Sequence, residues 1–196
     1  MNAMSENLPL FPLNTLLVPE MVLPLQIFEQ RYLRLIKDCL KNNVGFGVVP
    51  IRDGHEVGQV AMIYDIGVHA EIVDWSQGEN GLLNIKVAGG RKFKVLKTSL
   101  EDDQLMQSEV EYLPEEADDS IPSEFDGLNE MYDTLCDHPQ VQILNLPKAI
   151  SARQLGWFLS MLLPINRAQQ VDLLKMQAPV ERLEALADII DRLGQD

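Results

Sequence analysis

A period of two governs the apolar positions between residues 57 and 95, and it predicts a β-sheet. The alternating side chains are Val60, Met62, Val68, Ala70, Ile72, Leu83, Ile85, Val87, Phe93 and Val95, and the set closes with Val110 and Tyr112. Successive strand residues point to opposite faces, so this alternation is typical of strands with one buried face. Asn80-Gly81 is a strong hairpin signal. We expect a predominantly antiparallel sheet that is closed or strongly curled.

Helical spacing appears once before this pattern and repeatedly after it. Residues 29–40 carry apolar side chains on one helical side and charged ones on the other. After a connector over residues 101–122, the spacing predicts helices near 125–135, behind Ser151, over 167–176 and over 179–193. Ser151-Ala152-Arg153-Gln154 is a capping-box signature, and Pro179 suits the first turn of a helix.

The opening of the chain, residues 8–32, is an apolar run interrupted by Pro9, Pro12, Pro19 and Pro24. Proline lacks a backbone N–H and fixes φ, so this run predicts short strands rather than a long helix. Its last part, Pro24-Leu25-Gln26-Ile27-Phe28-Glu29-Gln30-Arg31-Tyr32, resembles the opening of the Lon amino-terminal, substrate-binding domain. It is most similar to stand-alone members, whose typical run is P-L-x-I-F-E-P-R-Y. Gln30 departs from the usual proline, and Glu20 from the glycine that often follows the proline at position 19.

Further landmarks extend this resemblance over residues 8–193. Gly58-Gln59-Val60-Ala61 and Gly90-Arg91-Lys92-Phe93-Lys94-Val95 look like the family's GxxA and GxRxxV runs, and residues 170–174 with 181–183 resemble its KQxLLE…ERLexL tail. The resemblance implies an α+β protein with an N-terminal PUA-like antiparallel β-barrel and a helix, followed by a C-terminal helical bundle. We expect residues 1–113 to form the β-barrel subdomain and residues 114–196 the helical subdomain.

The charge of the chain argues against nucleic-acid binding. Its formal net charge is −14, and residues 101–140 hold 14 acidic side chains and no Lys or Arg. Such a block repels phosphate backbones. We interpret it as a solvated connector and the polar face of a helix, with a docking site for a basic partner as the alternative. A basic strip of four residues, Arg91, Lys92, Lys94 and Lys97, lacks an interleaved aromatic ladder and leaves RNA binding as a weaker alternative.

Catalytic and metal-binding patterns are missing from the sequence. A full Lon protease needs an ATPase and a Ser/Lys peptidase, and 196 residues leave room for neither. No G-x-x-x-x-G-K-[ST] loop occurs, and we expect Gly89-Gly90 to form a strand turn. His55, His69 and His138 lie in different elements without metal-ligand spacing. We therefore expect no enzyme activity, no metal and no cofactor.

Two further groups of polar residues have structural explanations. Ser151 is better explained as a helix cap than as a nucleophile, because no His or Lys is placed to activate it. The acidic pairs 102–103, 115–116 and 118–119 lie in the connector, where we expect them to be solvated rather than catalytic.

Apolar side chains remain as the candidates for function. Val18, Pro19 and Met21 stand between two strand-like pieces and would lie at a loop tip, and Trp75 precedes a Gly-bearing turn. Trp157 lies on the other side of its helix from Leu155 and Leu159. Adaptable apolar surfaces suit loose recognition of unfolded segments. The alternative for each residue is packing in the core or between the two halves.

The sequence favours a non-catalytic, cytoplasmic module that binds unfolded or exposed apolar polypeptide segments, in association with a protease or chaperone machine. Cys39 and Cys136 lie far apart without CxxC spacing, which fits buried thiols in a reducing compartment. No run of 18 apolar residues predicts a membrane span. The rival interpretation is an enzyme or small-molecule binder that uses a cleft between the subdomains.

Overall fold

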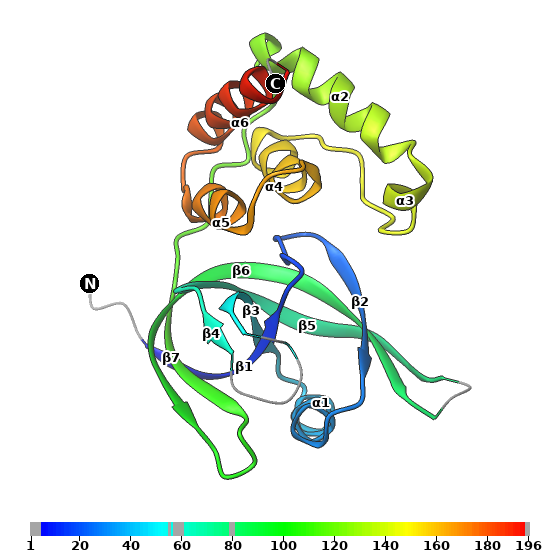
Figure 1. The fold of residues 1–196 in the computed structure, drawn as a ribbon, viewed down its shortest axis with the longest axis vertical. Coiled ribbons are helices and arrows are strands. Elements are labelled where there is room, and N and C mark those ends of the chain that lie inside the picture. Colours follow the sequence, from blue (N-terminus) through cyan, green and yellow to red (C-terminus); the bar gives the residue numbers. More distant parts are fainter. Residues whose placement is uncertain (1–4, 55, 57–60, 79–80, 195–196) are drawn as a thin grey trace. The chain divides into compact units, whose positions relative to one another are not determined.

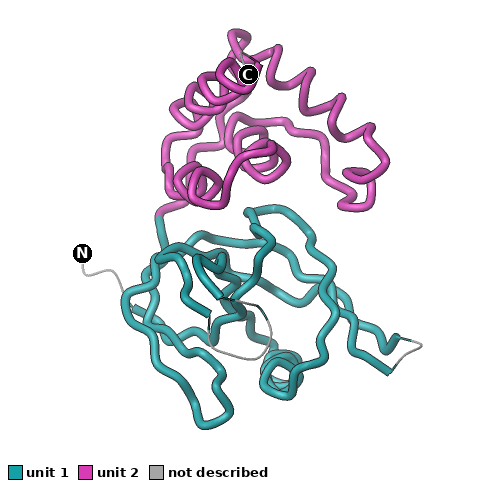
Figure 2. The backbone as a smooth tube through the Cα atoms, viewed as in Figure 1, with its two compact units in different colours: residues 1–113 teal, residues 114–196 magenta. Residues whose placement is uncertain are grey.

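The computed structural model describes residues 5–54, 56, 61–78 and 81–194. The chain divides into two compact units, residues 1–113 and residues 114–196 (Figure 2). The predictions that concern His55, Val60 and Asn80 fall outside the described residues.

The first unit is a sheet with one helix. Its elements are β1 (Glu6–Leu13), β2 (Val22–Ile27), α1 (Gln30–Asn42), β3 (Phe46–Asp53), β4 (Met62–Ile63), β5 (Ile66–Gln77), β6 (Leu83–Leu100) and β7 (Met106–Tyr112). Pairing runs in the order β1-β7-β6-β5-β3, and a parallel pairing of β1 with β3 returns to the first strand. β2 pairs with β6 and β4 with β3 (Figure 1). Every other pairing of the described strands is antiparallel, which confirms the predominantly antiparallel sheet.

The core of the sheet unit lies inside this ring of strands. One buried cluster contains Leu8, Leu10, Val49, Phe93, Met106 and Val110. Helix α1 adds Tyr32, Leu35, Ile36 and Cys39, all of them buried. The ring of Tyr32 stacks on Phe11 of β1, with centroids 3.9 Å apart. An ion pair lies at the start of the helix, where Arg31 Nη2 is 2.9 Å from Glu29 Oε2.

The expected turn at Gly89-Gly90 is wrong, because both glycines lie inside the continuous strand β6. A Cβ atom built on Gly89 would lie 2.2 Å from the carbonyl oxygen of Val18. The backbone at Val18 can therefore approach β6 this closely only because residue 89 has no side chain. Residues 101–122 are likewise not one connector, since β7 occupies part of that range.

The second unit is helical. It contains the 3₁₀-helix η1 (Ser123–Phe125) and the α-helices α2 (Asp126–Cys136), α3 (Pro139–Gln142), α4 (Ala152–Leu162), α5 (Arg167–Lys175) and α6 (Pro179–Leu193). Ser151 is the N-cap of α4, as predicted, but its side chain makes no capping bond. Gln154 Oε1 instead accepts from the N–H of Ile150. The reciprocal capping box lies at Asn166 and Gln169, at the start of α5.

None of the helices in the described residues is long and apolar enough to cross a membrane.

Candidate functional site

The exposed tryptophan of the sheet unit, Trp75, extends an apolar row across three strands. Leu25 of β2 lies opposite Ile85 of β6, and Ile85 lies opposite Trp75 of β5. Residues paired directly across a sheet point to the same face. Ile85 is buried, Leu25 is half-buried and the side chain of Trp75 is 60% exposed. The row therefore leads from the core to an indole that solvent reaches, which is the exposed one of the two alternatives for Trp75.

Polar rows precede and follow this apolar row along the strands, and alternation along a strand points their side chains to the opposite face of the sheet. Gln26 Nε2 donates to Asn84 Oδ1 at 3.2 Å, and Lys86 Nζ lies 3.0 Å from Asp74 Oδ2. The bond with Lys86 holds the pKa of the Asp74 carboxyl below its usual range. Both charged groups are exposed, so the pair contributes little stability.

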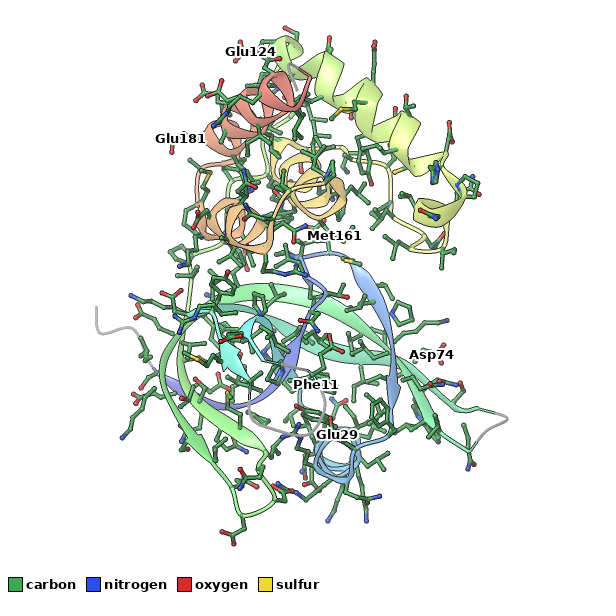
Figure 3. All side chains as sticks on the ribbon, viewed as in Figure 1. Phe11, Glu29, Asp74, Glu124, Met161 and Glu181 are labelled. Atoms are coloured by element: carbon green, nitrogen blue, oxygen red, sulfur yellow. The ribbon has the colours of Figure 1, made fainter. Side chains whose placement is uncertain are left out.

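A pocket of about 270 Å³ lies over these three rows and is named here the Trp75 pocket. It is lined by Pro24, Leu25, Gln26, Asp74, Trp75, Ser76, Asn84, Ile85 and Lys86. Its lining therefore includes both apolar and polar residues of the three rows. Figure 3 labels Asp74 on the hairpin formed by β5 and β6.

The same strand β2 borders a second pocket of about 170 Å³, named here the α1 pocket. It is lined by Phe11, Leu13, Pro24, Leu25, Gln26, Ile27, Phe28, Glu29, Tyr32 and Glu56. The side chain of Phe28 is 51% exposed beside it. Pro24, Leu25 and Gln26 belong to both pockets, so the two pockets adjoin along β2. Figure 3 labels Phe11 of β1 and Glu29, the residue before α1.

Strand β2 pairs with β6 alone among the strands of the described residues, so its other edge is open. The N–H of Gly89 donates to Met21 O, and the alternating ladder that follows turns the backbone groups of Leu23, Leu25 and Ile27 toward β6. The nitrogen of Pro24 consequently faces the open edge, which lacks a donor there. Proline at this place discourages another strand from pairing with the edge. Contacts through side chains suit β2 better than strand addition.

The loop between β1 and β2 differs from the expected exposed apolar tip. Val18 and Met21 are both 0% exposed, and Pro19 is buried as well. Glu20 is exposed, with a positive φ of 63°. The N–H of Glu20 donates to Gly89 O, and the N–H of Gly89 donates to Met21 O, both at 2.8 Å. The loop thus docks on β6 through its backbone, and its apolar side chains are buried, so the expectation that they form an exposed surface is wrong.

Trp157 is also buried, at 4% exposure, which settles its alternatives in favour of packing. Its indole Nε1 donates to Glu116 Oε1 at 3.2 Å. Arg182 donates to both oxygens of the same carboxylate, at 2.8 and 2.6 Å. The guanidinium groups of Arg153 and Arg182 lie 5.6 and 5.8 Å from the Trp157 ring centroid. Trp157 is therefore part of a buried polar network of the helical unit.

This network corrects the expectation that the acidic pairs after β7 are solvated, because Glu116 is only 7% exposed. Arg182 is 0% exposed, and its Nε also donates to Leu173 O at 2.9 Å. A Cβ atom on Gly156 would lie 2.9 Å from Arg182 Cδ, so glycine makes room for the buried arginine. Nothing in the local sequence separates Glu116 from its exposed acidic neighbours, so sequence reasoning missed it.

The basic strip does not form a continuous cationic surface. Lys92 is buried, while Lys94 and Lys97 are exposed. Arg91 Nη2 donates to Leu113 O at 3.0 Å, and its guanidinium lies 5.1 Å from the ring centroid of Tyr112. The strip therefore offers fewer free cations than the sequence suggests.

His69 contacts the same tyrosine. Its Nδ1 lies 2.5 Å from Tyr112 Oη, and burial lowers the pKa of His69 from its usual value of about 6.5. Burial likewise raises the pKa of Tyr112 to about 12. The part of the chain that the structure describes holds no group of three or more His, Cys, Asp or Glu residues suited to a metal ion.

The comparison with protein-family models decides the family. Residues 7–192 match the model of the ATP-dependent protease La (LON) substrate-binding domain. The chain belongs to this family. Solved structures agree: the chain is similar to a Lon N-terminal domain protein from Xanthomonas campestris, with a TM-score of 0.77 and 31% identity over 93% of this chain and 98% of the other. The N-terminal domain of the Lon protease of the Mycobacterium avium complex shares the fold at a TM-score of 0.62 and 18% identity, covering 93% of this chain and 97% of that one.

Curated relatives are far longer than this Lon-family chain. Lon protease of Porphyromonas gingivalis is 32% identical over 114 residues, which are 57% of this chain and 13% of the relative. Lon protease of Cytophaga hutchinsonii is 26% identical over 198 residues, which are 94% of this chain and 24% of the relative. The chain thus spans about a quarter or less of the length of these two proteins.

Proposed function

We propose that the chain is a non-catalytic polypeptide-binding module that recognises exposed apolar segments of unfolded proteins. The observation that carries this proposal is the 60% exposed Trp75 above the Trp75 pocket, next to a second apolar pocket on the same strand. The family is named for substrate binding, which is consistent with a recognition role. The closed path of strand pairings supports a PUA-like barrel as its scaffold, with a helical bundle after residue 113.

The Trp75 pocket suits side chains rather than a small, tightly held ligand. A large indole supplies contact area on binding with little loss of conformational entropy, and the lining residues Lys86, Asp74 and Gln26 carry groups that form hydrogen bonds. A flexible chain loses entropy when it binds, so we expect affinities of roughly micromolar to millimolar. Val18, Pro19, Met21 and Trp157 take the role of supporting residues in this proposal, because all four are buried.

The names of the relatives support a proposal about the partner of this chain. Two of them are named Lon protease, so we propose that bound polypeptide is delivered to a protease or chaperone machine. Cys39 and Cys136 are both free thiols, which is consistent with a cytoplasmic protein.

Binding of a reduced, alkylated model protein to a Trp75→Ala variant tests the proposal. Truncation of a central aromatic contact typically costs about 2 kcal/mol or more, so we expect roughly 30-fold weaker binding in fluorescence anisotropy. The matched control is Leu96→Ala, which removes another exposed apolar side chain of the same unit outside both pockets. If both variants bind the model protein as tightly as the parent protein does, the Trp75 pocket does not bind polypeptide.

A further inference from the structure

The α1 pocket combines an apolar lining with carboxylates. Seven of its lining residues are apolar or aromatic, namely Phe11, Leu13, Pro24, Leu25, Ile27, Phe28 and Tyr32. The charged groups among its described lining residues are Glu29 and Glu56. The pocket therefore offers space for a bulky apolar side chain with negative charge beside it.

The two carboxylates approach Tyr32, the aromatic residue that stacks on Phe11. Burial raises the pKa of Tyr32 to about 12; the nearby Arg31 opposes this shift, whereas Glu29 and Glu56 add to it. Both acidic groups thus act on the same side chain of the pocket. Arg31, a basic group beside Tyr32, is buried and paired with Glu29.

Both carboxylates keep room for another donor. An ionised carboxylate has about four acceptor positions. Glu29 receives a guanidinium N–H from Arg31, and Glu56 accepts from the backbone N–H of Asn14. Among the described residues, Arg31 is the cation paired with one of these two carboxylates, so the described part of the pocket retains a negative charge. A cationic group of a ligand would complement that charge at the edge of an apolar pocket.

We propose that the α1 pocket selects polypeptide segments in which a Lys or Arg side chain adjoins a bulky apolar residue. The apolar side chain enters between Tyr32, Leu25 and Phe28, and the cation lies against Glu29 and Glu56. The adjoining Trp75 pocket shares Pro24, Leu25 and Gln26 and takes a further apolar side chain of the same segment. This inference rests on the proposed polypeptide binding and adds a charge preference to it.

A set of three peptides tests the preference for a basic side chain. Three capped, fluorescein-labelled peptides share one apolar sequence with Leu and Phe, and carry Lys, Gln or Glu beside the Phe. In fluorescence anisotropy the Lys peptide should bind about three- to tenfold more tightly than the Gln peptide, as expected for a partly exposed charged contact. The Glu peptide should bind more weakly than the Gln peptide. Added salt should reduce these ratios, because it screens exposed charges.

The Glu56→Gln variant assigns the preference to the pocket. Gln keeps an oxygen that accepts the N–H of Asn14, so the fold is expected to persist while the charge is lost. The Lys-to-Gln affinity ratio should fall toward one in this variant, and Glu29→Gln should lower it as well. The matched control Glu71→Gln removes an exposed carboxylate of β5 outside both pockets, and it should leave the ratio unchanged.

The outcomes separate this inference from the proposed function. Equal binding of the Lys and Gln peptides, or an equal loss of preference in Glu56→Gln and Glu71→Gln, would overturn the inference and leave polypeptide binding intact. Absence of binding for all three peptides and for the unfolded model protein would overturn the proposed function as well.

Discussion

Replacing Gly89 with alanine should destabilise the sheet unit, because the β1–β2 loop occupies the space of a side chain. The added Cβ would lie 2.2 Å from Val18 O, 3.1 Å from Val18 C and 3.4 Å from Leu17 Cδ1. A side chain can rotate away from such a clash, whereas a backbone carbonyl moves only with its loop. That loop is held by two backbone hydrogen bonds to Gly89. Either the loop leaves β6 or the strand bends.

The size of the effect follows from these contacts. Overpacking a well-packed site costs about 1–3 kcal/mol, and each lost backbone hydrogen bond costs about 1 kcal/mol net. We therefore expect Gly89→Ala to lower the free energy of unfolding by roughly 2–5 kcal/mol, a large part of the usual 5–15 kcal/mol. The adjacent glycine is the matched control. A Cβ on Gly90 would meet its nearest atom, His69 O, at 3.5 Å, so Gly90→Ala should change stability by less than about 1 kcal/mol.

Urea unfolding followed by far-ultraviolet circular dichroism measures both variants against the parent protein. The expected result is a clearly lower midpoint for Gly89→Ala and a nearly unchanged midpoint for Gly90→Ala. If the two variants unfold at the same urea concentration, the reasoning about loop docking on β6 is refuted.

The buried ion pair and the buried histidine give two further predictions. Arg182→Met leaves the Glu116 carboxylate buried without its main partner, and it should lower the free energy of unfolding, measured in urea, by about 3–5 kcal/mol. Glu116→Leu combined with Arg182→Met should recover much of that loss. If Arg182→Met alone were as stable as the parent protein, the buried network would be contradicted. The pKa of His69 is lowered in the folded protein, so the unfolded chain binds this proton first as the pH falls below about 6.5. Stability should therefore drop between about pH 6.5 and the lowered pKa, and His69→Gln should flatten that slope; identical slopes in the two proteins would show that another group is responsible.

Periodic patterns predicted the regular elements well. The amphipathic spacing over residues 29–40 became α1, and the last helix spans Pro179–Leu193 as the proline start and glycine end indicated. Such signals lie within one element and depend on one buried face, so local sequence carries them.

Features that depend on contacts between distant segments could not be predicted in this way. The turn signal at Gly89-Gly90 was misread, because the need for glycine comes from Val18, about 70 residues away in the sequence. Glu116 was predicted to be solvated and is buried for the same reason, since its partner Arg182 lies on α6, far away in the sequence. The apolar loop at Val18–Met21 looked like an exposed surface, although its side chains complete the core.

The candidate site was predicted only in part. The sequence left Trp75 either exposed or packed, and the structure shows it exposed, between polar neighbours and before a turn. Its pocket depends on the register of β2, β6 and β5, which sets Leu25, Ile85 and Trp75 in one row. Register between strands far apart in sequence is not encoded in any single segment, so the α1 pocket and its carboxylates were missed.

The two tryptophans provide the most direct test of polypeptide binding at Trp75. The chain holds two Trp residues, so a ¹⁵N-labelled sample gives two indole N–H signals in a heteronuclear correlation spectrum. Trp75 is exposed, and the Nε1–H of Trp157 is buried against Glu116 and serves as an internal control. On titration with an unfolded model protein, the Trp75 signal should shift or broaden while the Trp157 signal stays in place. Saturable binding that leaves the Trp75 signal unchanged would contradict the account.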